Sequence, residues 1–144
     1  MIYTLTAVFG TAFLAATILP FSSEIVVAAA MADENIGRLA LWTVATGGNT
    51  LGAAVNYWLG RGANHYRERT WFPASPTQIG KAEIWFNRYG VWSLLMAWLP
   101  IGGDALTVIA GLLRVRFDIF LILVAIGKGA RYAAVIAGVD ALLF

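Results

Sequence analysis

The sequence predicts an all-α integral membrane protein with two inverted-topology repeats, each made of a Pro-broken re-entrant helical hairpin and a transmembrane helix. Three observations lead to this prediction: an apolar composition, a proline break in two apolar stretches, and a similarity between the two halves of the chain. Of the 144 residues, 60% are hydrophobic and 12% are charged, whereas soluble domains carry about 25% charged residues. We therefore expect the lipid bilayer to be the solvent of this chain.

The composition also excludes several classes of protein. The net charge of +2 comes from scattered cations, so we expect no nucleic-acid partner. The chain has no Cys and a single His, and it therefore offers no disulfide, no thiol catalysis and no His or Cys cluster for a metal. No nucleophile–base set and no phosphate-binding loop is visible either. We expect neither an enzyme nor a protein with a metal or a cofactor.

Four apolar stretches follow one another along the chain, at about 2–32, 39–60, 90–113 and 117–144. Residues 1–19 contain no Lys or Arg, which a signal peptide would need, so we expect them to belong to the mature protein. A helix needs about 20 apolar residues to cross the bilayer, and the second stretch fits one crossing.

The first and third stretches are interrupted by Pro20 and Pro100, and an acid follows each proline four residues later, at Glu24 and Asp104. Proline removes a backbone donor and clashes with the preceding helical turn. The freed backbone groups must be buried in protein or face a water-filled cavity. We therefore expect each of these stretches to form a re-entrant hairpin.

The hydrophilic segment 61–89 lies between the two halves. Ser75 and Gln78 are spaced as a capping box, with Pro76 at the first helical position, and Gly90 is expected to end the helix. The apolar residues of this helix share one face: Ile79, Ala82, Trp85, Phe86 and Tyr89. This pattern predicts an amphipathic helix in the headgroup plane; a short soluble connector is the alternative.

A shift of 80 residues aligns the two halves without a gap, and the informative match is the pattern Leu-Pro-x-x-x-acid at 19–24 and 99–104. The chain is then one membrane domain, 1–144, with repeat 1 at about 2–60, the connector at about 61–89 and repeat 2 at about 90–144.

The charges in the loops indicate the orientation of the repeats. If the hairpins return to their own side, seven cations lie on one face: Arg61, Arg67, Arg69, Lys81, Arg88, Arg114 and Arg116. The opposite loop carries Asp33, Glu34 and Arg38. A plain four-helix bundle would instead put two of the arginines beside these acids. Because cytoplasmic loops are rich in Lys and Arg, we favour the inverted repeats, with the connector in the cytoplasm.

Four ionisable side chains fall inside the apolar stretches: Glu24, Asp104, Lys128 and Arg131. Each costs roughly 2.5–3.5 kcal/mol at the centre of a membrane helix, so such residues normally face the protein interior and mark substrate or proton paths. Both acids begin a half-helix, where the partial positive charge of the helix N-terminus stabilises an anion. We expect the acids to couple protons or substrate and the bases to serve as charge partners or phosphate contacts. A structural ion-pair network is the alternative.

Other residues are expected to support this site as polar or hinge positions: Pro20, Ser22, Ser23, Asn49, Thr50, Asn56, Pro100, Gly102 and Gly103. The three polar residues of the second stretch could add hydrogen bonds to the site. They could equally serve helix packing, together with the neighbouring glycines.

Several motifs occur together along the chain: Leu19-Pro20-x-x-Ser23-Glu24, Gly48-Asn49-x-x-Gly52, Tyr57-x-x-Gly60-Arg61, Phe86-x-x-Tyr89-Gly90, Trp98-Leu99-Pro100 and Gly127-Lys128-x-x-Arg131-Tyr132. In order and spacing they resemble the DedA/VTT (SNARE-associated-like) membrane protein family, in particular its short YqaA-type branch. The resemblance implies an inner-membrane protein with two re-entrant hairpins in inverted repeat, which takes part in lipid translocation and in proton-motive-force and envelope homeostasis.

The resemblance also implies roles for single residues. Glu24 matches a carboxylate that is essential in the family, and Arg61 matches the family's Gly-Arg at the end of the span. Typical members carry arginines on both sides of the second proline, where this chain has none. Lys128 and Arg131 would replace those cations from another helix.

Together these observations predict a multi-pass transporter or lipid translocase of the bacterial inner (plasma) membrane, which moves a lipid or a substrate with an anionic headgroup in a proton-coupled manner. The alternatives are a proton-coupled exporter of small cationic compounds and a structural or envelope-homeostasis protein without transport. Membrane lipids are the expected partners. A homodimer is an option, because four short membrane units are few to enclose a path.

Overall fold

A computed structural model of the chain describes residues 1–17, 23–62, 76–99 and 103–143. In these ranges the chain forms helices and no strands: α1 (Ile2–Thr17), α2 (Ser23–Ala30), α3 (Arg38–Arg61), α5 (Pro76–Tyr89), the 3₁₀ helix η1 (Gly90–Trp98), α6 (Gly103–Leu112) and α7 (Phe117–Leu143). The prediction of an all-α protein is confirmed.

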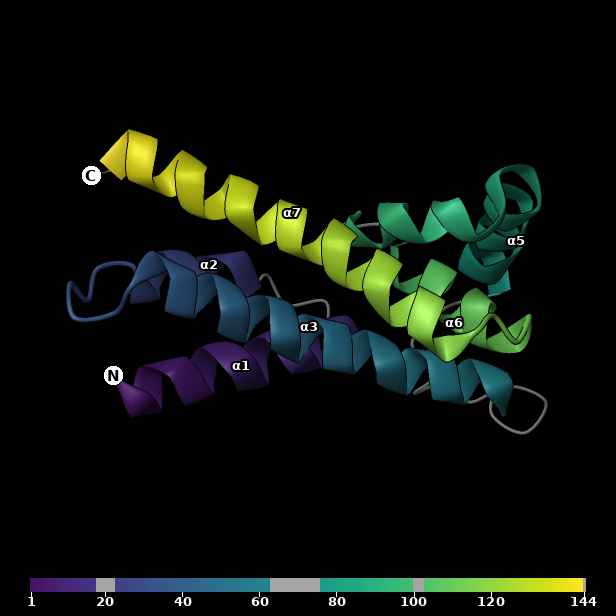
Figure 1. Cartoon of the computed structure of the whole chain (residues 1–144), viewed down its shortest axis with the longest axis horizontal. Coiled ribbons are helices and arrows are strands. Elements are labelled where there is room, and N and C mark those ends of the chain that lie inside the picture. The colour runs from purple at the N-terminus through teal and green to yellow at the C-terminus, as the bar shows by residue number, and fades with distance from the viewer. Residues whose placement is uncertain (18–22, 63–75, 100–102, 144) are drawn as a thin grey trace.

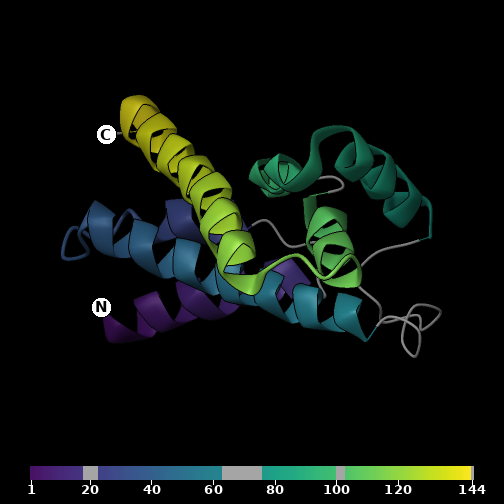
Figure 2. The same ribbon diagram turned by 45° about the vertical axis from the view of Figure 1, so that its right-hand side comes forward.

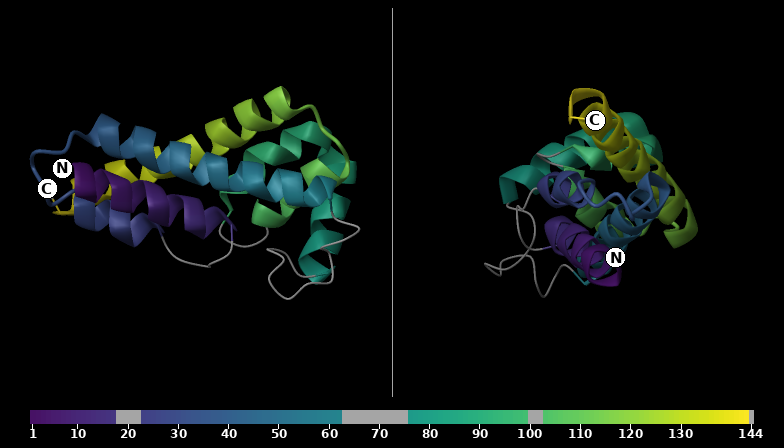
Figure 3. Two further views of the ribbon diagram at one scale, coloured as in Figure 1. Left: turned by 90° about the horizontal axis from the view of Figure 1, so that it is seen from below. Right: turned by 90° about the vertical axis from the view of Figure 1, so that its left-hand side faces the viewer.

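The two long helices, α3 and α7, run along most of the molecule in opposite directions and contact each other (Figure 1). α1 packs along α3, with contacts that reach Asn56. Both chain termini and the loop between α2 and α3 lie at one end of the molecule, which we call the terminal end (Figure 3). α5 and the loop between α6 and α7 lie at the other end, which we call the α5 end. Figure 2 shows α5, η1 and α6 as a group at that end.

α1 and α2 run in opposite directions on either side of the first predicted break, and so do η1 and α6 on either side of the second (Figure 3). α1 begins and α2 ends at the terminal end, whereas η1 begins and α6 ends at the α5 end (Figure 3). The regular helices stop on either side of each break, at Thr17 and Ser23 and at Trp98 and Gly103. The predicted hinge residues Pro20, Ser22, Pro100 and Gly102 lie outside the described residues.

Small residues allow the helices to approach closely. A Cβ atom on Gly48 would lie 2.5 Å from the carbonyl oxygen of Phe9, and one on Gly52 would lie 2.6 Å from that of Phe13. These two glycines therefore bring α3 directly against the backbone of α1, as small residues do at helix interfaces in membranes. The same holds between α3 and α6, where the Cα of Gly111 faces the backbone of Tyr57.

The protein covers part of the apolar face predicted for α5. Ala82 and Phe86 are buried, whereas Trp85 and Tyr89 are 44% and 46% exposed. The side chain of Ile79 lies outside the described residues. α5 packs against α6 and η1, and this contact covers only part of the aromatic face that the helical periodicity brings together. α5 ends at Tyr89, directly before Gly90 as predicted, and the φ of +63° at Gly90 favours glycine.

The buried apolar side chains form two clusters. One centres on Tyr57, Ile109 and Phe120 near the α5 end. The other centres on Val8, Leu41 and further residues of α2 and α7 near the terminal end. Along α3, the cluster near the terminal end reaches Ala45, and the cluster near the α5 end begins at Ala53. The stretch between the two clusters is therefore where polar side chains meet.

By length and composition, α7 is the one helix in the described ranges that is long and apolar enough to cross a membrane. α1 and α6 are apolar but shorter. α3 has 24 residues, enough to span the hydrocarbon core, but its Thr and Asn residues make it less apolar. Leu51, Val55, Ile122 and Ile126 on α3 and α7 are exposed, which suits contact with lipid.

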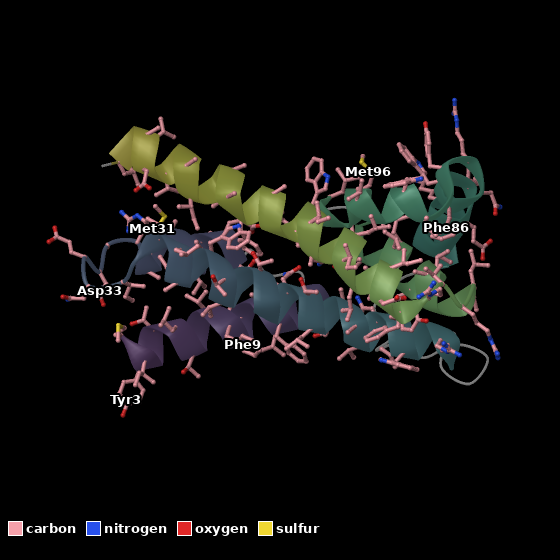
Figure 4. The ribbon with its side chains drawn as sticks, viewed as in Figure 1. Tyr3, Phe9, Met31, Asp33, Phe86 and Met96 are labelled. Atoms are coloured by element: carbon pink, nitrogen blue, oxygen red, sulfur yellow. The ribbon has the colours of Figure 1, made fainter. Side chains whose placement is uncertain are left out.

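The two ends of the molecule carry different charges. The described cations of the α5 end are Arg61, Lys81, Arg88, Arg114 and Arg116. The terminal end carries Asp33, Glu34, Arg38 and Asp140; Figure 4 shows Asp33 and Phe86 at opposite ends. In the loop before α3, hydrogen bonds from Asn35 hold the pKa of the Asp33 carboxyl below its usual value.

Candidate functional site

The two membrane acids begin the two half-helices. Glu24 lies in the first turn of α2 and Asp104 in the first turn of α6. Ser23 and Gly103, which open these helices, are both buried. An acid in a first helical turn interacts favourably with the free N–H groups and the positive end of the helix dipole. The local sequence after each break thus stabilises a carboxylate at the start of the half-helix.

α7 supplies one base to each acid. Lys128 and Arg131 are three residues apart and therefore lie on the same side of the helix. Arg131 forms an ion pair with Glu24, and the Lys128 Nζ lies 3.7 Å from the Asp104 Oδ1. The four predicted site residues thus come together as two acid–base pairs, which join α7 to both half-helices.

Arg131 contacts a residue beside each break. One guanidinium nitrogen, Nη2, faces the Glu24 carboxylate, and the other, Nη1, donates a hydrogen bond to the backbone carbonyl of Trp98 at 3.1 Å. Trp98 is the last residue of η1. The side chains of Arg131 and Glu24 are 26% and 20% exposed. A single residue of α7 therefore links the start of α2 to the end of η1.

Tyr132 and Ser23 form a second contact beside this ion pair. Their hydroxyl oxygens lie 2.5 Å apart, and both side chains are buried. Consecutive residues of α7 thus bind consecutive residues at the start of α2. The role of Tyr132 was not predicted from the sequence, although it follows Arg131 in one of the motifs that carry the family resemblance.

Lys128 is held by α3 as well as by α6. Its ammonium group donates a hydrogen bond to Asn49 Oδ1, while Asn49 Nδ2 donates to the carbonyl of Ala12 at 2.9 Å. The Lys128 side chain is 3% exposed, but that of Asp104 is 41% exposed. The base of this pair is therefore enclosed, whereas its acid is accessible.

Asn56 and Thr107 extend the polar contacts. Asn56 Nδ2 donates to the carbonyl of Ala16 at 2.7 Å and to Thr107 Oγ1 at 3.2 Å. Thr107 Oγ1 in turn donates to the Asp104 carbonyl at 2.6 Å. Thr107 was not among the predicted site residues. Thr50 was a predicted site residue, but its side chain makes no hydrogen bond within the described part of the chain.

We call this connected set the central polar cluster: Ser23, Glu24, Asn49, Asn56, Asp104, Thr107, Lys128, Arg131 and Tyr132. Its member Asn49 lies between the two apolar clusters along α3, and Tyr132 also belongs to the apolar cluster near the terminal end. Its two acids and two bases balance each other in charge. Within the described ranges, no group of three or more His, Asp or Glu side chains could hold a metal ion.

Comparison with known proteins gives consistent similarities. The VTT domain family matches the chain over residues 2–140. The chain is 36% identical over 133 residues to the inner membrane protein YqaA of Escherichia coli K12. The alignment covers 91% of the chain and 87% of that protein. The same figures hold for the inner membrane protein YqaA of Shigella flexneri. The chain is also 34% identical over 139 residues to an uncharacterized protein of Haemophilus influenzae. That alignment covers 89% of the chain and 82% of the Haemophilus protein. No solved structure shows a significant match.

Proposed function

Because this chain belongs to the VTT domain (DedA) family and resides in the bacterial inner membrane, we propose that it is a transporter or lipid translocase. Its substrate is a membrane lipid or another molecule with an anionic headgroup, and its transport is coupled to protons. Membrane lipids are thus both its solvent and its partners.

The observation that supports this proposal best is the pair of ion pairs between α7 and the two half-helices. A buried ion pair contributes little net stability, and apolar residues of similar size often serve as well. Four charges in an otherwise apolar interior are therefore expected where a protein must bind or release charge. A carboxylate can take up a proton, and a base that it leaves free can bind an anion.

In the proposed membrane arrangement, α3 and α7 cross the bilayer, while α1 with α2 and η1 with α6 are re-entrant hairpins that enter from opposite sides. The pair α1 and α2 opens toward the terminal end, whereas the pair η1 and α6 opens toward the α5 end (Figure 3), and this supports the arrangement. It makes the halves inverted repeats, whose interface is the usual site of transport. The central polar cluster occupies that interface.

The proposed orientation has the α5 end in the cytoplasm, because that end carries the surplus of cations. α5 then lies at the headgroup level. Trp85 and Tyr89 are exposed there beside Arg88, whose guanidinium lies 5.4 Å from the centre of the Tyr89 ring. Aromatic and basic side chains together are typical of membrane interfaces.

In the proposed mechanism, Glu24 and Asp104 provide the coupling carboxylates, and Lys128 and Arg131 neutralise them or contact a phosphate. Asn49 and Asn56 orient these groups. An exporter of small cations is less well supported, because each acid already faces a base, and a cationic substrate would have to displace it.

Purified protein in vesicles tests the proposal. The probe is fluorescent phosphatidylglycerol, whose movement between leaflets is followed by chemical quenching of the outer leaflet, with and without a pH gradient. Asp104→Asn and Glu24→Gln remove one carboxylate each, and Glu34→Gln, in the exposed loop before α3, is the matched control. We expect transport by the wild type and the control, and its loss in at least one of the other two variants at normal accumulation.

Two outcomes contradict the proposal. Wild-type protein that moves the probe no faster than protein-free vesicles excludes lipid translocation. Full transport by both Asp104→Asn and Glu24→Gln would mean that the charges serve the structure alone.

A further inference from the structure

The two ion pairs of the central polar cluster differ in how firmly they are held. Arg131 binds the Glu24 carboxylate with one nitrogen and the Trp98 carbonyl with another. The adjacent hydroxyl contact between Ser23 and Tyr132 supports the same junction. The Glu24 side chain is 20% exposed. This pair therefore has fixed partners on α2, η1 and α7.

The Asp104–Lys128 pair is open by comparison. Its nitrogen and oxygen lie 3.7 Å apart, beyond the length of a direct hydrogen bond, and the Asp104 side chain is 41% exposed, twice the fraction of Glu24. The hydrogen bond that Lys128 does make goes to the neutral Asn49 amide. Asp104 is thus the acid that a proton can reach without breaking a tight contact.

The two bases also differ in chemistry. A guanidinium cannot lose its proton in a protein, so protonation of Glu24 would leave a permanent cation beside the Trp98 carbonyl. An ammonium group has three donors and no planar geometry to satisfy. When Asp104 is protonated, Lys128 keeps Asn49 as an acceptor and has donors available for another anion.

We infer that Asp104 carries the coupling proton and Lys128 binds the anionic group of the substrate, while the Glu24–Arg131 pair ties the two hairpins to α7. This inference rests on the proposed function. The substrate class it names is a phosphodiester with one negative charge, as in an anionic phospholipid headgroup. Glu24 and Arg131 are then positioning residues.

The charge balance of this step is complete. In the resting site the Asp104 carboxylate and the Lys128 ammonium sum to zero. One proton converts the carboxylate to a neutral acid, and one phosphodiester anion then pairs with the ammonium. The loaded site again sums to zero, so one proton and one anion move together without net charge.

Among the residues that the structure describes, few other ionisable groups lie near Asp104. α7 contributes Lys128 and Tyr132. Arg131 of α7 and its partner Glu24 of α2 lie farther from Asp104. α3 contributes the neutral side chains Asn49 and Asn56, and η1 contains no charged residue. Lys81 and Arg88 of α5 are exposed at the surface, and Glu83 lies on the same helix. The proton response of the site should therefore follow Asp104 and Lys128.

The test uses full-length protein in vesicles, with fluorescent phosphatidylglycerol as the probe. A pH gradient is imposed at zero membrane potential, and a potassium diffusion potential of either sign is imposed at equal pH. We expect the gradient to accelerate the movement of the probe and the potential to have no effect. Asp104→Asn should lose the response to pH, and Asp104→Glu should restore it with a shifted midpoint.

Glu24→Gln is the matched control from the other hairpin. It should keep the midpoint of the wild-type pH profile, although its thermal stability and maximal rate fall. A second arm offers radiolabelled glycerophosphoglycerol, the same phosphodiester without acyl chains. If the protein takes up this compound in preference to the lipid, the result supports the roles of Asp104 and Lys128. It contradicts the proposal that the substrate is a lipid.

Other outcomes overturn the inference and leave the proposed function intact. If wild-type protein moves the lipid but Glu24→Gln loses the pH response and Asp104→Asn keeps it, the two pairs have the opposite roles. If a membrane potential drives movement at equal pH, the proton and the anion do not move as a neutral unit. If the wild type moves neither compound, the proposed function itself fails.

Discussion

Arg131 and Glu24 form an ion pair that joins the last helix of the protein to the start of the half-helix α2. The same guanidinium binds the carbonyl of Trp98, at the end of η1. Two segments that are each interrupted by a proline in the sequence are thus held by one side chain.

The first prediction concerns the stability of this junction. Removing one partner of a buried pair costs about 3–5 kcal/mol, and partial exposure lowers this to about 1–3 kcal/mol. Arg131→Met should therefore unfold at a lower temperature in detergent than Arg131→Met combined with Glu24→Leu. Tryptophan fluorescence during heating measures the difference. Equal midpoints for the single and the double variant would show that the pair is not formed.

The second prediction concerns the hydroxyl contact between Tyr132 and Ser23. Tyr132→Phe and Ser23→Ala should each lower the free energy of unfolding by about 1–3 kcal/mol, because each leaves a buried polar group without its partner. The double variant should cost clearly less than the sum of the two single variants, as expected for residues in contact. Additive effects in this cycle would contradict the contact.

The third prediction concerns the close approach of α3 and α6. A Cβ atom on Gly111 would clash with the backbone of Tyr57, whereas one on Gly138 of α7 would have no neighbour within 4 Å. Gly111→Ala should destabilise the protein by about 1–3 kcal/mol, the usual cost of overpacking. Gly138→Ala is the control and should leave the melting temperature unchanged or raise it. Tolerance of Gly111→Ala would argue against this helix contact.

The fourth prediction concerns orientation, and the absence of Cys from the chain makes it simple to test. Glu34→Cys and Lys81→Cys introduce single exposed thiols at the terminal end and at the α5 end. In intact spheroplasts a membrane-impermeant maleimide should label the Glu34→Cys variant. It should label the Lys81→Cys variant only after the membrane is permeabilised. Labelling of both variants from outside would contradict the proposed topology.

Much of this architecture follows from simple patterns in the sequence. The helices are interrupted around the two Leu-Pro-x-x-x-acid patterns, and Gly90 ends α5, because backbone restrictions at proline and glycine act locally. The residues that carry charge into the apolar interior were also identifiable, since ionisable side chains are rare there. The family resemblance is confirmed by the match over residues 2–140.

The partners of these residues were not predictable. The spacing of Lys128 and Arg131 sets their common face, but which acid each one meets depends on how α7 packs across both half-helices. The contact between Tyr132 and Ser23 depends on the same packing. For α5, periodicity groups Trp85 with Phe86, whereas the position of α6 buries only Phe86. These features are tertiary, and no local pattern encodes them.

The most direct test of the central claim compares transport and stability in one variant, Asp104→Asn. The substitution preserves the shape of the side chain and removes its proton site. If the central polar cluster couples a proton to an anionic substrate, the purified variant should still fold and melt cooperatively, at a lower temperature because Lys128 loses its acid partner, yet lose pH-driven movement of phosphatidylglycerol in vesicles. Wild-type rates with an unchanged pH response would contradict the claim.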